Sequence, residues 1–385
     1  MRIKFLLPVL MFAISVFCIS AYGQNEGRNL GVSVELRDEI RNSYIFIFKD
    51  DVPSSKVNKQ ANDIARAAGG NVTRVYKTAI KGFSAKMPGE VAAQLAAKNP
   101  NIAYYEPDAI AFASPKPPWA GGGGGEEDTG CTPQQTPWGI TRVGGAIDGT
   151  GKSAWVIDTG IDLDHSDLNV DVQRSANFIF RGKNSPNDGH GHGTHVAGTI
   201  GAIDNGCDVV GVAPGANLVA IRVLNNSGSG SYTGVIAGVD YVAANAQSGD
   251  VANMSLGGPK SNALNDAVIG AAQSGVKFAL AAGNESDDSN NHSPASAQHN
   301  NIYTVSAIDS NDYFAWFSNY GNPPIDCAAP GVNVLSTKKG GGTTTFSGTS
   351  MAAPHVAGLL LNGQPVSNGY AIDDPDGTSD SICHR

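Results

Sequence analysis

Three short segments of the 385-residue chain carry an acid, an imidazole and a hydroxyl, in that order. Residues 154–158 form an apolar run that ends in Asp158, and His192 lies where a helical pattern begins in a histidine-rich segment. Ser350 follows a glycine at a turn into another helical pattern. A serine hydroxyl becomes a nucleophile when a histidine takes its proton and a buried carboxylate orients that histidine. The three segments therefore predict hydrolysis through an activated serine.

A fourth segment adds a hydrogen-bond donor. Residues 281–284 read Ala-Ala-Gly-Asn at the end of an apolar run, so Asn284 lies at the end of a predicted strand. Attack on a carbonyl produces a tetrahedral oxyanion, which is stabilised by donors that are already in place. We expect the side-chain amide of Asn284 and the backbone N–H of Ser350 to supply them.

Each segment alone also has an ordinary explanation. An acid at a strand end is commonly a cap or turn residue, and a serine before a helix is commonly an N-cap. The spacing of His190, His192 and His195 is also compatible with a zinc hydrolase. A third hypothesis is a catalytically inactive binding protein with the same fold. The presence of all four groups favours the serine enzyme, and a serine-directed inhibitor would separate the three hypotheses.

The elements that must position these groups form an α/β pattern over residues 131–385. Apolar runs of strand length alternate with helical stretches in this region, which is typical of a doubly wound, mostly parallel sheet. The expected strands lie at 154–157, 218–224, 251–254, 276–282 and 302–308, and the helices at 192–202, 231–246 and 261–274. Chemistry collects at the carboxyl ends of such strands, and the four segments fall there.

A separate, smaller pattern precedes this region. Residues 43–113 read strand, helix, strand, strand, helix, strand, which predicts a small α+β sandwich of the ferredoxin-like type. Residues 115–130 contain prolines and five consecutive glycines, and we expect a linker there. Residues 1–23 have the basic start, apolar stretch and small-residue end of a secretory signal peptide; an uncleaved anchor is the alternative.

Composition limits the possible partners. Lys and Arg total 26 against 35 Asp and Glu, a net charge of −9, which argues against nucleic acid and anionic membranes. We expect an extracellular protein that acts as a monomer and has no membrane contact once the signal is removed. Four cysteines follow the predicted signal, and an even number in an exported chain permits two disulfides; free buried thiols are the alternative. They are Cys131, Cys207, Cys327 and Cys383.

At these motifs the sequence resembles the subtilisin superfamily, and within it the proteinase K-like branch, over residues 133–360. The resemblance implies a subtilisin-like fold and peptide-bond hydrolysis, with Asp158, His192 and Ser350 as the catalytic triad and Asn284 as the oxyanion donor. The match is to the histidine that begins His-Gly-Thr-His, so the other two histidines of that segment are expected to be structural. The α/β-hydrolases are excluded because their triad runs serine, acid, histidine.

The resemblance also implies where a peptide would bind. An extended substrate would lie as an added strand between two segments of the enzyme, held by main-chain hydrogen bonds. The residues of the two segments are Gly228, Ser229, Gly230, Ser255, Leu256 and Gly257. The wall of the first specificity pocket would include Ala281 and Gly283, which are small and uncharged. We therefore expect broad specificity with apolar or aromatic residues before the cleaved bond; the glycines could instead serve only turns or bulges.

Two calcium sites are implied in the same way, since oxygen ligands suit Ca²⁺. The first set comprises side chains of Gln134, Asp167 and Asn205 with backbone carbonyls of Ile203, Cys207 and Val209. The second comprises the carbonyls of Asn300 and Ile302 with the carboxylate of Asp326. Solvated polar loops are the alternative for both.

Residues 43–113 resemble the inhibitor-type propeptide of the superfamily, and we expect the whole propeptide to span residues 24–114. This implies a self-processed precursor whose tail, about residues 108–114, lies in the active site. The calcium assignment brings Cys131 near Cys207, because Gln134 lies three residues from Cys131 and shares an ion with Cys207. Cys327 is then left for Cys383. That bridge would tether the polar segment after residue 362, which lacks the longer helical finish of the family; peptide mapping could still show another pairing.

Overall fold

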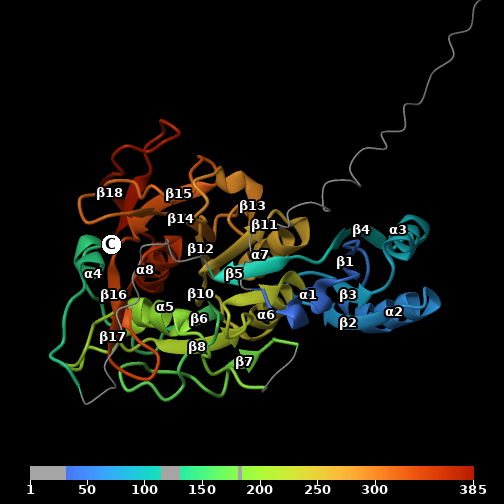
Figure 1. Cartoon of the computed structure of the whole chain (residues 1–385), viewed down its shortest axis with the longest axis horizontal. Coiled ribbons are helices and arrows are strands. Elements are labelled where there is room, and N and C mark those ends of the chain that lie inside the picture. Colours follow the sequence, from blue (N-terminus) through green and yellow to red (C-terminus); the bar gives the residue numbers. More distant parts are fainter. Residues whose placement is uncertain (1–31, 114–130, 181–183) are drawn as a thin grey trace, which may run out of the picture. The chain divides into compact units, whose positions relative to one another are not determined.

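A nine-stranded sheet organises the larger part of the protein in a computed structural model that describes residues 32–113, 131–180 and 184–385 (Figure 1). Its strand order is β18-β19-β15-β14-β12-β10-β6-β8-β7. Neighbouring strands are parallel from β7 to β19, and only β18 pairs antiparallel. The strands are β6 (Ser153–Asp158), β7 (Ala176–Asn177), β8 (Asn217–Arg222), β10 (Val251–Met254), β12 (Lys277–Ala281), β14 (Ile302–Ile308), β15 (Ile325–Pro330), β18 (Val366–Tyr370) and β19 (Ser381–His384). The predicted α/β class, with a mostly parallel central sheet, is confirmed.

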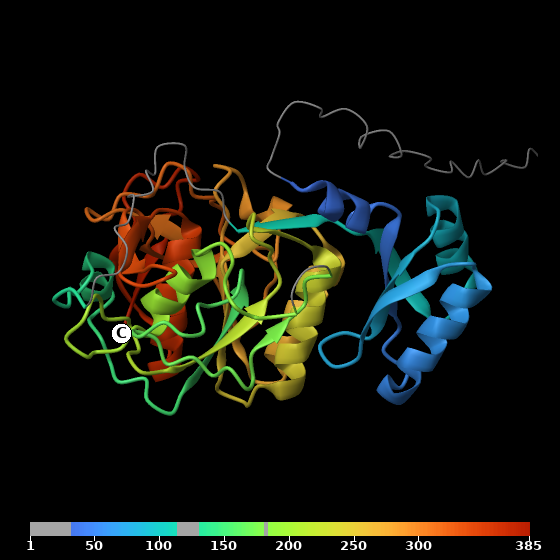
Figure 2. The same cartoon turned by 60° about the horizontal axis from the view of Figure 1, so that its bottom comes forward.

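The central strands are apolar throughout because helices cover both faces of the sheet. In β6 every residue is buried, and alternate side chains enter two different cores. Ala154 and Val156 pack in the core that contains α5 (His192–Gly201) and α8 (Thr349–Asn362). Trp155 and Ile157 pack in the core that contains α6 (Tyr232–Asn245) and α7 (Asn262–Gln273). Figures 1 and 2 show these two pairs of helices around the sheet.

Residues 33–113, here called the N-terminal module, form a second, four-stranded antiparallel sheet. Its order is β2-β3-β1-β4, which is the order of the predicted ferredoxin-like sandwich. The elements are β1 (Ser43–Phe48), α2 (Ser54–Ala67), β2 (Asn71–Tyr76), β3 (Gly82–Lys86), α3 (Gly89–Lys98) and β4 (Ile102–Pro107). Phe46 and Phe83 stack in its core with ring centroids 4.9 Å apart.

One helix of the N-terminal module was not predicted. The helix α1 (Val34–Ile40) begins at the N-cap Ser33, whose hydroxyl accepts a hydrogen bond from the backbone N–H of Leu36 at 3.2 Å. Leu36 is its only buried residue, so seven residues give no detectable hydrophobic period.

The segment after α8 ends in a hairpin instead of a long helix. Strand β19 joins the large sheet beside β15, and β18 pairs with β19 at the sheet edge. Cys383 in β19 is bonded to Cys327 in β15, so the disulfide fastens a segment that buries little apolar surface. A separate two-stranded sheet pairs β16 (Val334–Thr337) with β17 (Thr343–Phe346). The helix α4 (Trp138–Arg142) precedes β6 in the chain.

Two predicted segments, the signal peptide at 1–23 and the linker at 115–130, lie outside the described residues. Across the ranges that are described, no helix combines the length and apolar character needed to cross a bilayer.

Candidate active site

The acid and the imidazole meet at the carboxyl end of the central strand. Asp158 is the last residue of β6, and His192 is the first residue of α5. The Oδ1 atom of Asp158 lies 2.8 Å from Nδ1 of His192, and both side chains are buried. The Nε2 atom of His192 is also buried and has no hydrogen-bond partner among the described residues. The ring nitrogen opposite Asp158 is therefore the one placed to accept a proton.

The loop before α5 is held by Asp188, which the sequence reading did not single out. Its buried carboxylate accepts five hydrogen bonds, from backbone N–H groups of residues 190, 191 and 194 and from the hydroxyls of Thr159 and Thr194. Gly191, the N-cap of α5, has φ = 102°, a conformation that favours glycine. The known capping preference concerns the residue directly before a helix, which is Gly191 here, so it does not mark Asp188 in the sequence.

Ser350 lies at the start of α8, where Gly348 precedes the helix. Its Oγ donates a hydrogen bond of 3.0 Å to the carbonyl of Ser255, and the hydroxyl of Ser255 donates one of 2.8 Å to the carbonyl of Ser350. The predicted nucleophile is therefore fixed to one of the two predicted substrate-binding segments. Both serines are buried.

Asn284 follows β12, and its amide orientation is determined by its contacts. Its Oδ1 accepts hydrogen bonds from the backbone N–H and the hydroxyl of Thr349, at 2.9 and 3.0 Å. Only the oxygen can accept from a backbone N–H, so the NH₂ group must point the other way. That Nδ2 is buried and has no partner within the described part of the chain. Asn284 is bonded to Thr349, the residue before Ser350, so this donor without an acceptor lies close to the predicted nucleophile. An oxyanion would require such a donor.

The two predicted substrate segments already hold a strand. Residues Ile110–Ala113 form β5, which pairs antiparallel with β11 (Leu256–Pro259) on one side and β9 (Ser229–Ser231) on the other. In this sheet Phe112 lies opposite Gly257 and Ser229, and Ala111 lies opposite Gly230. The backbone N–H of Ala113 also donates to the carbonyl of Gly228 at 2.8 Å. The fourth strand, β13 (His292–Ser293), pairs with β11.

The pocket wall has one feature that the sequence reading left out. Ala281 is buried, and Gly283 has φ = 109°, so the wall carries small residues as expected. A side-chain carbon at Gly283 would lie 2.5 Å from Oε2 of Glu285. Glu285 accepts a hydrogen bond of 2.7 Å from Asn319, and its side chain is 45% exposed. A carboxylate therefore lies beside Gly283, together with the amide of Asn319.

His195, the third histidine of the motif, has a structural position. The Nε2 atom of His195 lies 3.0 Å from the carbonyl of Val334, and its ring stacks on Phe346 at 4.5 Å. Burial lowers the pKa of His195 to about 3, so the ring is neutral at ordinary pH. His192 is paired with Asp158, and no group of three or more His, Cys, Asp or Glu side chains in the described ranges could hold a metal ion. This geometry argues against the zinc hydrolase hypothesis.

The first predicted calcium set lies where three separate segments meet, at residues 134, 167 and 203–209. Asn205 donates from Nδ2 to Asp167 at 3.0 Å, and its backbone N–H donates to Oε1 of Gln134 at 3.0 Å. Isolated bridges join Cys207 to residue 133 and Val209 to residue 135, while the backbone N–H of Ile203 donates to the carbonyl of Asp167. The Oδ2 atom of Asp167 is buried and lacks a partner among the described residues. The side-chain oxygens of Gln134 and Asn205 accept backbone N–H groups, and Asn205 presents its NH₂ to Asp167. The orphaned Oδ2 of Asp167 is therefore the part of this set that suits a hard cation.

The second predicted set is more open. Asp326 is an exposed residue whose carboxylate accepts a hydrogen bond of 2.8 Å from the backbone N–H of Thr304. Asn300 is exposed and Ile302 begins β14. This set therefore lacks the buried unpartnered oxygen of the first.

Both disulfides occur in the expected pairing. Cys131 is joined to Cys207 with an S–S distance of 1.98 Å, and Cys327 to Cys383 with 2.04 Å.

The N-terminal module supplies carboxylates to two helices beside the cleft. Glu106 accepts a hydrogen bond from the hydroxyl of Ser261 and one of 3.1 Å from the backbone N–H of Asn262, at the start of α7. Asp108 accepts a hydrogen bond of 3.1 Å from the backbone N–H of Thr233, in the first turn of α6. In the opposite direction, Asp240 of α6 accepts from three consecutive backbone N–H groups, those of residues 77–79. Negative charge is favourable at a helix N-terminus, so these contacts stabilise the junction.

Comparisons with known proteins agree with this geometry. The subtilase family model matches residues 149–363. The chain is 37% identical over 353 residues to the subtilisin-like serine protease AsES of Sarocladium strictum, covering 87% of this chain and 83% of that protein. It is 35% identical to subtilisin E of Bacillus subtilis, covering 97% and 93%. A solved structure of a cold-adapted subtilisin-like serine proteinase matches with a TM-score of 0.56 at 41% identity, covering 64% of this chain and 97% of that one.

Proposed function

Because the chain belongs to the subtilase family of serine peptidases, we propose that it is a secreted endopeptidase that works through Asp158, His192 and Ser350. The observation that carries the proposal is the buried pair of Asp158 and His192, 2.8 Å apart, with the opposite ring nitrogen unpartnered among the described residues. Secretion is supported by the two disulfides, which persist in oxidising compartments, and by the signal-like pattern of residues 1–23.

In the proposed reaction, Oγ of Ser350 attacks the carbonyl carbon of the peptide while its proton passes to Nε2 of His192. Asp158 accepts the Nδ1–H and stabilises the imidazolium that forms. The oxyanion receives hydrogen bonds from Nδ2 of Asn284 and the backbone N–H of Ser350. The C–N bond then breaks as His192 returns its proton to the leaving amine. Water, deprotonated by His192, hydrolyses the acyl-enzyme and restores the serine.

The substrate of this proposal is an extended polypeptide that takes the place of β5. Main-chain pairing with β9 and β11 does not depend on side chains, which supports broad specificity. Ala281 and Gly283 leave room for an apolar or aromatic residue before the cleaved bond. The carboxylate of Glu285, which lies beside Gly283, would also allow a basic residue of the substrate to approach the rim of this pocket.

The N-terminal module is, in this proposal, the enzyme's own inhibitor, and residues 24–114 are its propeptide. The support is that β5 occupies the cleft with the hydrogen-bond pattern of a bound peptide. The chain would be cut after β5 by its own active site, and the cut module would leave later.

Calcium would be held by the first predicted set, comprising side chains of Gln134, Asp167 and Asn205 and carbonyls of Ile203, Cys207 and Val209. When bound, the ion supplies positive charge to a buried carboxylate and links the segment at 131–135 to the loop at 203–209. An ion that binds only the native state stabilises it by mass action. The second set, with Asp326, would give a weaker site.

A fluorophosphonate probe tests the proposed function. Once the N-terminal module has been removed, the probe should abolish peptidase activity and add its mass to the peptide that contains Ser350. A Ser350→Ala chain should remain unlabelled, and a zinc chelator should not reduce activity. Loss of activity with the zinc chelator, or a folded mature enzyme that takes up no label, would contradict the proposal and favour a zinc enzyme or an inactive binding protein respectively.

A further inference from the structure

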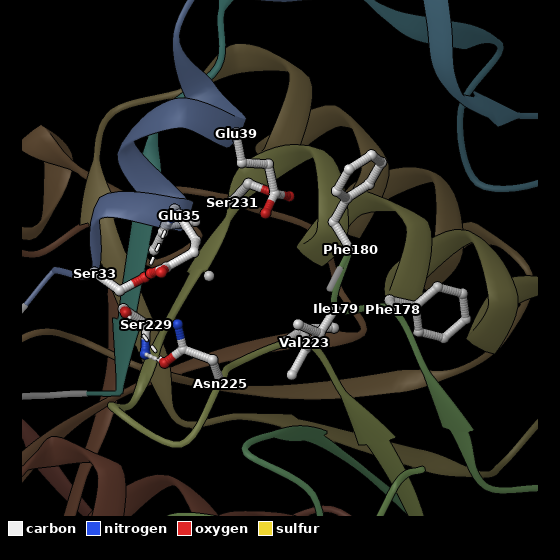
Figure 3. A pocket seen from close by; sticks show the side chains of 12 residues that line it. Ser33, Glu35, Glu39, Phe178, Ile179, Phe180, Val223, Asn225, Ser229 and Ser231 are labelled. Atoms are coloured by element: carbon white, nitrogen blue, oxygen red, sulfur yellow. Dashed lines mark hydrogen bonds between the residues drawn. The ribbon is translucent and has the colours of Figure 1, made fainter. Parts of the chain in front are cut away.

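The helix α1 contacts the strand that receives the substrate. Its one buried side chain is Leu36, which is 4% exposed. Its Glu39 accepts a hydrogen bond of 2.8 Å from the hydroxyl of Ser231, the last residue of β9. Figure 3 shows the carboxylate of Glu39 beside Ser231. The N-terminal module therefore reaches β9 twice, once through β5 and once through α1.

Ser231 is the residue at which the two contacts meet. It pairs with Ile110 of β5, and its side chain accepts a hydrogen bond of 3.2 Å from the backbone N–H of Gly234 as the N-cap of α6. The same hydroxyl donates to Glu39. The substrate strand, the first turn of α6 and α1 are thus joined through a single side chain.

The surface beneath α1 is only partly filled. A cavity of about 280 Å³ lies between the helix and the catalytic module, with Glu35 and Glu39 on one wall. Figure 3 shows Phe178 and Phe180 across the cavity from Ser33 and Glu35, and Val223 also lines it. Leu36 and Glu39 of α1 both line this cavity, and Glu39 makes the hydrogen bond to Ser231 described above. Such a contact can be lost without unfolding either partner.

The contact of α1 is independent of the chain connection that follows β5. Ala113 ends β5, whereas α1 is joined to the module through β1. A cut after β5 frees the end of that strand and leaves Leu36 and Glu39 where they are. The strand β5, the carboxylates of Glu106 and Asp108 and the helix α1 all hold the module, so their contacts must be lost together before a bound module can leave, which slows dissociation.

From these contacts, we infer that α1 is an additional anchor, beside β5, Glu106 and Asp108, that keeps the cut N-terminal module on the enzyme and prolongs its latency. The helix α1 of the same chain occupies the surface that is formed by β9, residues 178–180 and Val223. The inference rests on the proposed self-processing. In this inference, α1 controls the release of the module and has no part in the cut, because the cut requires only that β5 lies in the cleft.

The test is a time course on the full-length chain. Cleavage is followed by gel, and activity by a short chromogenic peptide; the lag is the time between half-cleavage and half-activity. Leu36→Ala with Glu39→Ala should shorten the lag by about tenfold or more, because losses at small interfaces act mainly on dissociation. The cleavage rate should be unchanged. The matched control is Val34→Ala with Arg37→Ala, which alters exposed residues of the same helix and should leave the lag as it is.

Two further measurements keep the outcomes separate. Thermal unfolding of each variant in the uncut Ser350→Ala background reports whether the N-terminal module still folds; if Leu36→Ala unfolds it, Glu39→Ala alone carries the test. An equal lag in the anchor and control variants would overturn the anchor. A wild-type chain that is never cut would instead contradict the proposed self-processing.

Discussion

The carboxylate of Asp108 accepts a hydrogen bond of 3.1 Å from the backbone N–H of Thr233, the second residue of α6. Asp108 is also bonded to the hydroxyl of Ser43, at 3.0 Å, and is 8% exposed. It is therefore buried at the junction between the N-terminal module and the helix that begins beside the cleft. Burial raises the pKa of Asp108 to about 6, against the opposing effect of hydrogen bonds from Thr233 and Ser43, and Glu39 raises it slightly further.

This shift predicts how pH affects the cut complex. The carboxyl of Asp108 has an ordinary pKa near 3.9 when the module is free and a pKa of about 6 when the module is bound. Between these two pH values, formation of the complex therefore takes up a proton. The contribution of Asp108 to binding is thus fully present below about pH 4 and is lost as pH rises through 6. The difference corresponds to roughly 3 kcal/mol, or on the order of a hundredfold in affinity.

The measurement is gel filtration of the cut complex at pH 5 and pH 8, with the fraction of co-eluting module as the readout. Asp108→Asn keeps an oxygen for Thr233 but cannot ionise, so its retention should depend less on pH. If the wild type is held more tightly at pH 8, the sign of the argument is wrong. The charged side chains of Arg74 and Lys86 line the same small cavity as Asp108 and Glu39. Glu39→Gln removes the charge of the second carboxylate at this cavity and serves as a second comparison.

Ser350→Ala should abolish peptidase activity and self-processing together, because one nucleophile serves both. The full-length chain should persist in a host that lacks other proteases, with the N-terminal module attached. Mass spectrometry of the purified protein gives the answer. Normal maturation of this variant would remove Ser350 from the proposed role.

Asn284→Leu should lower kcat much more than it raises KM. Its amide would contact the oxyanion of the transition state more strongly than the carbonyl of the substrate, so its loss acts on the chemical step. Removal of one such donor in enzymes of this kind costs on the order of a hundred- to thousandfold in kcat. Steady-state kinetics on a peptide ester and a peptide amide would measure it, and an effect confined to KM would contradict the assignment.

Removal of calcium should lower the melting temperature and speed self-digestion without blocking the chemistry directly. The expected cause is loss of an ion that binds only the folded chain. Asp167→Asn should reduce the response to a chelator, while Asp326→Asn should reduce it less. Calorimetry of the inhibited enzyme with and without chelator decides the matter; equal melting temperatures would argue for a solvated loop.

Local motifs were the features that could be predicted from the sequence. The strand that ends in Asp158 and the helix that begins at His192 each appear in a few consecutive residues, so their types and positions were recoverable. The alternation of β6 between two cores likewise follows from its uninterrupted apolar run. The strand order of the N-terminal module followed from its pattern of elements.

Relationships between distant residues could not be predicted in the same way. The contact of Asp108 with Thr233 joins positions 125 residues apart, and each residue alone is unremarkable in type. The helix α1 has one buried residue and gives no period. The position of the Glu285 carboxylate beside Gly283 depends on how the turn after Gly283 folds. These features arise from tertiary packing, which a single sequence does not display.

The strand β6 has a consequence for anyone who wishes to engineer this enzyme. Its alternate side chains belong to two separate hydrophobic cores, and its last residue is the carboxylate that orients His192. Both cores therefore help to position Asp158, and substitutions in either core should be checked for their effect on His192 even where they lie far from the cleft. Within the C-terminal hairpin, Cys383 of β19 belongs to the same core as Ala154, whereas β18 at the sheet edge is exposed throughout and is the safer place for redesigned surfaces.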